Sequence, residues 1–84
     1  MFSMYCVYIL KCNDGSLYTG ITTDMEKRFR EHANGKGGAY TRSHGAQKIV
    51  YTENRRNRSA AQKREAEIKR LARRRKLALI ASRL

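Results

Sequence analysis

The stretch VYILKCNDGSLYTGIT, residues 7–22, contains two β-prone runs on either side of a turn signal. Apolar and aromatic residues dominate positions 4–12, and the strand pattern resumes over positions 16–22. The intervening sequence Asn13-Asp14-Gly15 is typical of a tight reversal between antiparallel strands. The first part of the chain is therefore predicted to be a β-hairpin.

Two tyrosines, Tyr8 and Tyr18, lie on either side of this turn, and their relative placement depends on its length. A two-residue loop of Asp14 and Gly15 would put them on opposite faces, because side chains alternate along a strand. A three-residue loop with Gly15 in the left-handed conformation pairs Tyr8 with Gly20 and puts both phenols on one face. Sheet packing would explain tyrosines in either register, so a shared functional role requires the three-residue loop.

A helix is predicted directly after the hairpin. Residues 22–24 are good N-cap residues, and Met25, Phe29 and Ala33 recur at helical spacing. The pair Asn34-Gly35 is a typical helix end, so this helix should stop there.

Residues 35–45, GKGGAYTRSHG, are predicted to form a glycine-rich loop that carries Tyr40, Arg42 and His44. Tyr40 could stack on a nucleobase and Arg42 could bind a phosphate. A surface loop without a role explains these side chains equally well.

One more strand and two more helices are predicted in the second half. Residues 48–52 have a strand pattern, and Ser59 is expected to cap a helix that runs from Ala60 to Leu71. A last helix over residues 73–83 would pack through Leu77, Ile80 and Leu84. The order β-β-α-β-α-α predicts a single α+β domain over residues 1–84, with a small three-stranded antiparallel sheet flanked by helices.

The chain is strongly basic for its size. Its 84 residues include 19 Lys and Arg against 7 Asp and Glu, which gives a formal charge of +12. Such a charge favours a polyanionic partner, of which nucleic acid is the leading candidate. An anionic membrane surface is the weaker alternative, because the late helices lack a large aromatic face. Without a signal-peptide pattern or an apolar run of about 20 residues, a soluble cytoplasmic protein with no obligate protein partner is expected.

The positive charge concentrates late in the chain. Twelve of the 19 Lys and Arg residues lie between Arg55 and Arg83. With so few acids among them, they are predicted to attract the phosphate backbone without reading sequence. The densest part consists of Lys69, Arg70, Arg73, Arg74, Arg75 and Lys76.

One acidic residue falls on the apolar side of the second predicted helix. Glu65 lies four positions after Ala61 and three before Ile68, on the same inward stripe as residues 71–72. A carboxylate in that place is costly unless it is paired or binds a metal. A salt bridge to Arg28 or to another arginine is the structural alternative.

Several of these segments together resemble the GIY-YIG endonuclease superfamily, in particular its small stand-alone bacterial members of YhbQ type. The resemblance extends over residues 5–80. The matching pieces are V-Y-I with Tyr8, Y-T-G with Tyr18, Arg28 ten residues beyond Tyr18, His32 four residues later, and Glu65 within REAEIK.

This resemblance implies hydrolysis of phosphodiester bonds in DNA with one divalent cation, Mg²⁺ or Mn²⁺, held by Glu65. It implies that Arg28 contacts a phosphate, for which the forked donors of a guanidinium are suited. Tyr8 and Tyr18 correspond to the two signature tyrosines, one of which would position or deprotonate the attacking water. His32 would share in the proton transfer, although a structural or exposed histidine is an open alternative.

The sequence also departs from the superfamily pattern. Cys6 replaces the glycine of the first motif, Thr19 takes the middle place of the second, and no asparagine follows Glu65 as in some relatives. Without an attached recognition domain, cleavage directed by branched, damaged or single-stranded structure is expected rather than sequence-specific cleavage. A noncatalytic nucleic-acid-binding protein on a nuclease scaffold is the second hypothesis, which the joint retention of both tyrosines, Arg28 and Glu65 disfavours.

Overall fold

The computed structural model describes residues 4–83 and contains a three-stranded antiparallel sheet. Its strands are β1 (Tyr5–Cys12), β2 (Leu17–Thr22) and β3 (Ala46–Arg55), in the spatial order β2-β1-β3. The predicted α+β class and three-stranded antiparallel sheet are confirmed. Because β1 is the central strand, residues 7–10 in its middle are completely buried.

The turn between β1 and β2 is the three-residue form. Gly15 has a φ of +85°, and its amide donates to the carbonyl oxygen of Cys12 at 2.9 Å. The amide of Cys12 in turn donates to the carbonyl oxygen of Ser16 at 2.9 Å. The resulting register pairs Tyr8 with Gly20, so the prediction that the two phenols share a face is confirmed.

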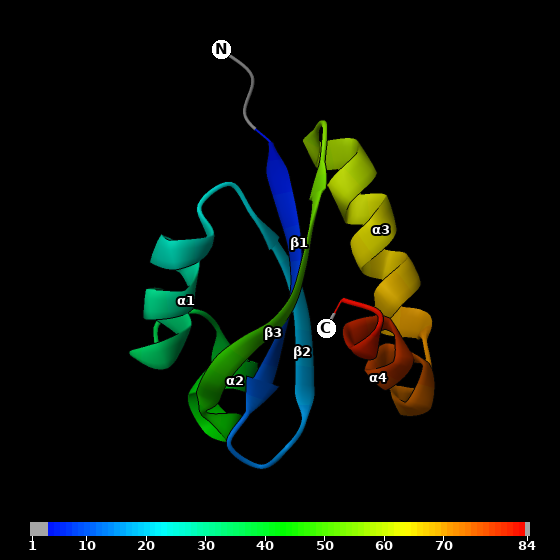
Figure 1. The fold of residues 1–84 in the computed structure, drawn as a ribbon. Coiled ribbons are helices and arrows are strands. Elements are labelled where there is room, and N and C mark those ends of the chain that lie inside the picture. The colour runs from blue at the N-terminus through cyan, green and yellow to red at the C-terminus, as the bar shows by residue number, and fades with distance from the viewer. Residues whose placement is uncertain (1–3, 84) are drawn as a thin grey trace.

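Helices cover both faces of the sheet (Figure 1). On one face lie α1 (Met25–Ala33) and α2 (Ala39–His44), and on the other lie α3 (Arg58–Arg70) and α4 (Arg73–Ala81). The apolar core lies between the sheet and the second pair of helices, and consists of Val7, Ile9, Tyr51, Ala61 and Ile68. Since side chains alternate along β1, Tyr8 points to the opposite face, toward α1.

The segment between α1 and β3 contains a helix that the sequence pattern did not predict. The six residues of α2 lie within the expected glycine-rich loop. Gly38, with φ +137°, and Gly45, with φ +73°, provide the backbone reversals at its two ends. These glycines mark the ends of a short helix rather than an open loop, and the element order is β-β-α-α-β-α-α.

Two predicted boundaries in the second half are wrong. The third strand is longer than residues 48–52, because it pairs along most of β1. The helix α3 begins at Arg58 with Asn57 as its N-cap, instead of Ser59. The Asn57 side chain accepts a hydrogen bond from the Ala60 amide at 2.9 Å, which leaves Ser59 inside the first turn.

Two alanines that were predicted to pack are exposed. Ala33 is exposed because the buried position near the end of α1 belongs to its neighbour His32. Ala72 is exposed because α3 ends at Arg70, so that residue 72 belongs to the connection between two helices.

The last helix, α4, packs only in part as predicted. Ile80 lies against the core, whereas Leu77 is 45% exposed. The helix ends at Ala81, before the predicted end at Arg83, and Leu84 lies outside the described residues. No helix within residues 4–83 is long and apolar enough to cross a membrane.

A buried ionic network joins β3 to α3. The side chain of Glu53 is 5% exposed, accepts a hydrogen bond from Tyr51, and pairs with Arg55 and Arg64 at 2.7 Å each. Burial alone would raise the pKa of Glu53, but hydrogen bonds and charges from these partners hold its pKa below the ordinary value. The network thereby fixes α3, which carries Glu65, against the sheet.

Candidate active site

The ring of Tyr8 lies over the neighbouring strand because its cross-strand partner has no side chain. A Cβ atom at Gly20 would collide with the hydroxyl and the ring of Tyr8. Tyr8 therefore extends over Gly20 toward the edge strand β2, and it is only 1% exposed. The glycine of the second tyrosine motif is thus needed to place the tyrosine of the first.

A buried chain of hydrogen bonds runs from Tyr8 through His32 to Thr41. The Tyr8 hydroxyl lies 2.9 Å from His32 Nε2, and His32 Nδ1 lies 2.7 Å from Thr41 Oγ1. A Cβ atom at Gly37 would collide with the imidazole, so the backbone before α2 closes directly over His32. The three buried side chains join β1, α1 and α2.

Tyr18 belongs to the same cluster. Its ring centroid lies 6.4 Å from that of Tyr8 and 5.2 Å from that of His32. It also stacks on Tyr40 of α2 at 5.7 Å, and Tyr40 stacks on His44 at 3.9 Å with the ring planes 7° apart. A nucleobase at Tyr40 would therefore join an existing aromatic stack.

Arg28 lies beside the cluster on α1, and Arg42 is exposed on α2. The Arg28 Nη2 donates to the carbonyl oxygen of Gly37 at 2.8 Å, and Nη1 lies 3.3 Å from Glu31. A guanidinium has five N–H donors, so Arg28 keeps donors for a phosphate in this position.

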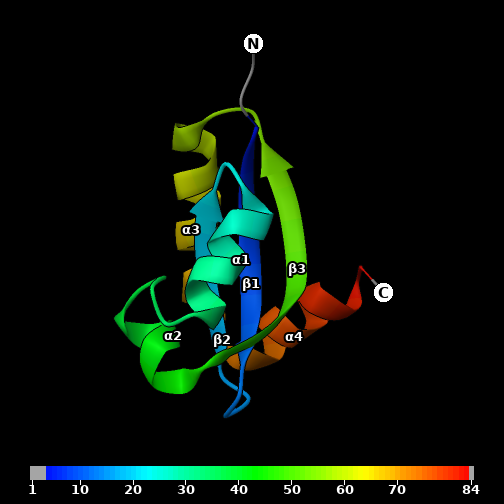
Figure 2. The ribbon, with the colours of Figure 1, turned by 90° about the vertical axis from the view of Figure 1, so that its left-hand side faces the viewer.

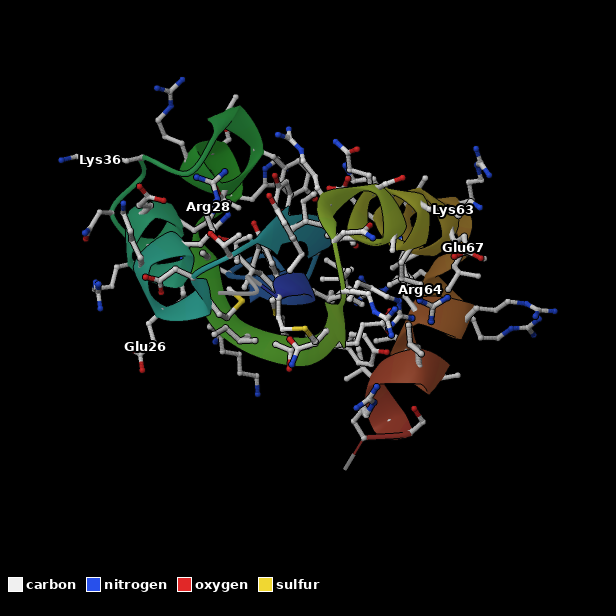
Figure 3. The ribbon with its side chains drawn as sticks, turned by 90° about the horizontal axis from the view of Figure 1, so that it is seen from above. Glu26, Arg28, Lys36, Lys63, Arg64 and Glu67 are labelled. Carbon is white, nitrogen blue, oxygen red and sulfur yellow. The ribbon has the colours of Figure 1, made fainter. Side chains whose placement is uncertain are left out.

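Glu65 approaches from the other side of the sheet. It lies on α3, which packs against β2 and β1, and Figure 2 shows α3 beside the edge strand β2. Its side chain is 23% exposed, and its carboxylate pairs with Lys69 at 3.3 Å. Glu65 is therefore ion-paired, as in the structural alternative, but its partner among the described residues is Lys69 rather than an arginine. Figure 3 shows the two sides of the sheet, with Arg28 on the α1 side and Glu67 on the α3 side.

Burial and neighbouring charges act on the pKa values of the cluster. Burial raises the pKa of Tyr8, hydrogen bonding to Arg28 lowers it, and the charges of Tyr18 and Glu65 raise it. The charge of Glu65 is the smallest of these influences on the pKa of Tyr8. Burial, and then the charge of Arg28, lower the pKa of His32, so its imidazole is neutral near pH 7.

The late basic residues do not converge on the tyrosines. Arg73, Arg74 and Arg75 are exposed at the start of α4, on the face of the sheet opposite to Tyr8. Lys69 and Arg70 are exposed at the end of α3. The side chains that the structure does bring together are Tyr8, Tyr18, His32 and Tyr40, with Arg28 beside them. Among the described residues, Glu65 pairs with Lys69 and makes no hydrogen bond or ion pair with this cluster.

The donor set limits which metals could bind. Across residues 4–83, no group of three or more His, Cys, Asp and Glu side chains is placed to hold a metal ion. A structural zinc site needs four protein ligands, whereas Mg²⁺ is commonly held by one or two carboxylates together with waters and substrate phosphates. Glu65 with a bound phosphate would be a donor set of the kind that Mg²⁺ or Mn²⁺ accepts.

The family model of the GIY-YIG catalytic domain matches residues 4–78. The chain belongs to this family. A UPF0213 protein of Clostridium perfringens is 54% identical over 79 residues, which cover 94% of this chain and 85% of the relative. A UPF0213 protein of Natronomonas pharaonis is 46% identical over 81 residues, which cover 96% and 95% of the two chains. The solution NMR structure of a UPF0213 protein from Bacillus halodurans, 45% identical, has a TM-score of 0.60 and covers 93% of this chain and 83% of that chain.

Membership of the GIY-YIG family confirms the resemblance and places the chain in a nuclease family. The two tyrosine motifs of the family lie on β1 and β2, and the hairpin register brings Tyr8 and Tyr18 to one face.

Sequence reasoning missed two contributors to the cluster, Thr41 and Gly37. A signal existed, because a histidine on the buried side of a helix needs polar partners. The neighbouring glycines Gly37 and Gly38 also allow a close backbone approach. Which hydroxyl would meet His32 depends on the position of α2, which the sequence pattern did not predict.

Proposed function

We propose that this protein is a divalent-metal-dependent endonuclease that hydrolyses phosphodiester bonds in DNA, directed by DNA structure rather than sequence. The observation that supports this function most strongly is the shared face of Tyr8, Tyr18 and His32, beside Arg28, in a chain of the GIY-YIG family. The expected place of action is the cytoplasm, where nucleic acid is the abundant polyanion.

Tyr8 and His32 supply a proton-transfer pair. A phenol activates water only if it can take up a proton, so the deprotonated form of Tyr8 must be within reach. Burial outweighs the influence of Arg28, so the pKa of Tyr8 lies above its ordinary value, and the positive charge of a bound cation would have to favour the deprotonated form. His32, neutral near pH 7, touches the Tyr8 oxygen and can exchange a proton or a hydrogen bond with it.

Arg28 binds the scissile phosphate in this proposal. Its contacts with Gly37 and Glu31 fix the guanidinium at the edge of the cluster. Fixed donors that face the negative charge of the transition state lower the barrier, because they need no reorganisation during the reaction.

Glu65 would hold the Mg²⁺ or Mn²⁺ ion. A bound divalent cation stabilises charge on the phosphate oxygens and assists departure of the leaving oxygen. Lys69 must release Glu65 for this to happen, which costs little because an ion pair between residues four apart on a helix contributes about 0.3–0.5 kcal/mol.

The ion pair with Lys69 also supports the second hypothesis. A carboxylate that is already paired needs no metal, so the same scaffold could bind nucleic acid without cutting it. A single substitution separates the two functions, because Glu65→Gln keeps the size of the side chain and removes the charge that attracts the cation.

The experiment compares the native protein, Glu65→Gln and Glu67→Gln on labelled duplex, branched and single-stranded DNA and on RNA, with Mg²⁺ or Mn²⁺. Glu67 is the matched control, an exposed acid on the same helix. We expect Glu65→Gln to lower the cleavage rate by at least about 100-fold, while Glu67→Gln cleaves like the native protein.

Metal-free DNA binding by Glu65→Gln should be unchanged or tighter, because a negative charge near the phosphates is removed. Its melting temperature should hardly change, since only the pair with Lys69 is removed. Native-like cleavage by Glu65→Gln would contradict the metal-ligand role. Binding without cleavage of any substrate by the native protein would support the noncatalytic alternative.

A further inference from the structure

We propose that the groove between α4 and the hairpin end of the sheet binds an acidic peptide segment of a partner protein. One apolar side chain of that segment would insert between the helix and the strands. Because α4 covers the face of the sheet opposite to Tyr8, a bound peptide would leave the tyrosine cluster open to DNA. The inference therefore goes beyond the proposed nuclease function and does not depend on it.

The groove is a cavity of about 230 Å³ with an aliphatic lining. Leu77 and Ile80 line it from α4, and Leu17 and Val50 line it from the two edge strands. Figures 1 and 2 both show α4 beside the hairpin end of the sheet, and Leu77 is 45% exposed there. Pockets that hold whole drug-sized ligands have volumes of about 300–1,000 Å³, so this smaller cavity suits a single apolar side chain.

Three cations surround this aliphatic lining. Lys11, Lys48 and Arg73 line the groove from β1, β3 and α4. Among residues 4–83, none of the three forms an ion pair with an acid. The carboxylate of Asp14, in the turn beside the groove, accepts hydrogen bonds from within its own turn instead. The groove is therefore an apolar cavity with unneutralised positive charge at its rim.

The two lysines of the rim are placed against each other. The register of β1 with β3 pairs Lys11 directly with Lys48. Like charges at directly opposite positions of antiparallel strands destabilise a sheet. A carboxylate bound beside both lysines would relieve this repulsion, so the groove is complementary to an anion that also carries an apolar group.

The lining distinguishes an acidic peptide from other anionic partners. Unpaired nucleobases are bound mainly by stacking on aromatic side chains, and no aromatic residue of the described chain lines the groove. A lipid surface requires a broad apolar face, whereas this feature is a small cavity. Aspartate and glutamate side chains pair with lysine and arginine, and an apolar side chain among them fills an aliphatic cavity. An acidic peptide with one apolar anchor supplies both kinds of contact.

Fluorescence anisotropy with labelled peptides tests the proposal. The probes are three peptides of four aspartates that end in leucine, isoleucine or phenylalanine. We expect at least one of them to bind the native protein, and to bind at least about tenfold more weakly when serine replaces its apolar residue. Failure of all three to bind, or equal binding of the serine peptide, would overturn the proposal.

Two substitutions and a matched control test where the peptide binds. Lys48→Glu reverses a charge at the rim of the groove, whereas Lys63→Glu makes the same change at an exposed position on α3. We expect Lys48→Glu and Leu77→Ser each to weaken peptide binding by at least about tenfold, and Lys63→Glu by less than about twofold. Equal losses in Lys48→Glu and Lys63→Glu would show that only the net charge attracts the peptide, which would overturn the assignment to the groove.

Melting temperatures without peptide verify that the variants fold and test the repulsion between the lysines. Lys48→Glu places opposite charges on facing strands and should therefore melt at a higher temperature than Lys63→Glu. A lower melting temperature of Lys48→Glu would contradict the repulsion between Lys11 and Lys48 on which the proposal depends.

A single-stranded oligonucleotide tests the alternative occupant. Leu77→Ser should bind it within about twofold of the native affinity, because binding of phosphates to cations requires no apolar anchor. If Leu77→Ser weakens oligonucleotide binding as much as it weakens peptide binding, the groove binds nucleic acid and the proposal is wrong.

Discussion

At Gly20 and Gly37 the absence of a side chain determines where two rings lie. A Cβ atom at Gly20 would displace Tyr8, and one at Gly37 would displace His32. The shared face of Tyr8 and Tyr18 was predictable from the hairpin turn, because the length of the loop fixes the strand register. The contacts that orient the rings of Tyr8 and His32 were not predictable, because these contacts join β1 and α1 to the segment around α2, which comes later in the chain.

The burial of His32 predicts how stability depends on pH. The folded protein lowers the pKa of His32 below the ordinary value of 6.5, whereas the unfolded chain does not. As the pH falls through 6.5, the unfolded state therefore takes up a proton that the folded state resists, and the free energy of unfolding decreases. Denaturant titrations between pH 8 and pH 5 should show this loss in the native protein.

His32→Gln is the control for that measurement, because it removes the titrating group. Its free energy of unfolding should fall less steeply over the same pH range, whatever its stability at pH 8. Equal slopes for the two proteins would show that His32 protonates as readily in the folded state as in the unfolded one.

At the scale of the elements, local sequence determined the hairpin better than the helix ends. The hairpin turn was predictable because Gly15 can adopt a conformation that most residues avoid. The start of α3 was not, because Asn57 and Ser59 are both good N-cap residues and sequence alone gives no decisive preference. The packing of α3 on the sheet selects Asn57, through tertiary contacts such as Arg64 with Glu53.

The two cap candidates differ in their expected effect on stability. Asn57→Ala removes the side-chain acceptor of the Ala60 amide and should lower the free energy of unfolding by about 1 kcal/mol. Ser59→Ala changes a residue inside the first turn and should stay within about 0.5 kcal/mol of the native protein. Chemical denaturation of both variants measures the difference, and a larger loss in Ser59→Ala would favour the boundary predicted from the sequence.

Over the whole molecule, the two faces of the sheet have different contents. One face carries the cluster of Tyr8, Tyr18 and His32, and the other carries the apolar core and the arginines at the start of α4. The sequence predicted the excess of positive charge and its concentration late in the chain, but not the face of the sheet on which it lies. That face depends on how the chain returns to the sheet after β3. The basic residues at 73–75 thus form a surface separate from the tyrosine cluster.

This separation predicts that the α4 arginines affect the affinity for DNA more than the rate of cleavage. Substituting Arg73, Arg74 and Arg75 together with Gln should reduce the slope of log affinity against log salt, by about 0.7–0.9 for each phosphate that the variant no longer neutralises. The cleavage rate at saturating DNA should stay within about twofold of the native rate, because these side chains lie on the other face of the sheet. Binding titrations at several salt concentrations measure the slope, and a native affinity that is independent of salt would contradict a phosphate-binding role.

The proposed nuclease function depends most on Tyr8, and the measurement that tests it most directly is the Mg²⁺-dependent cleavage rate of Tyr8→Phe. The matched control is Tyr5→Phe, since Tyr5 is on the same strand but packs against the core on the other face. We expect Tyr8→Phe to remain folded and to cleave at least about 100-fold more slowly than the native protein, because the phenol that takes up the proton is removed. Tyr5→Phe should cleave at the native rate. A folded Tyr8→Phe variant that cleaves as fast as Tyr5→Phe would contradict the proposal that Tyr8 and His32 act as a proton-transfer pair in catalysis.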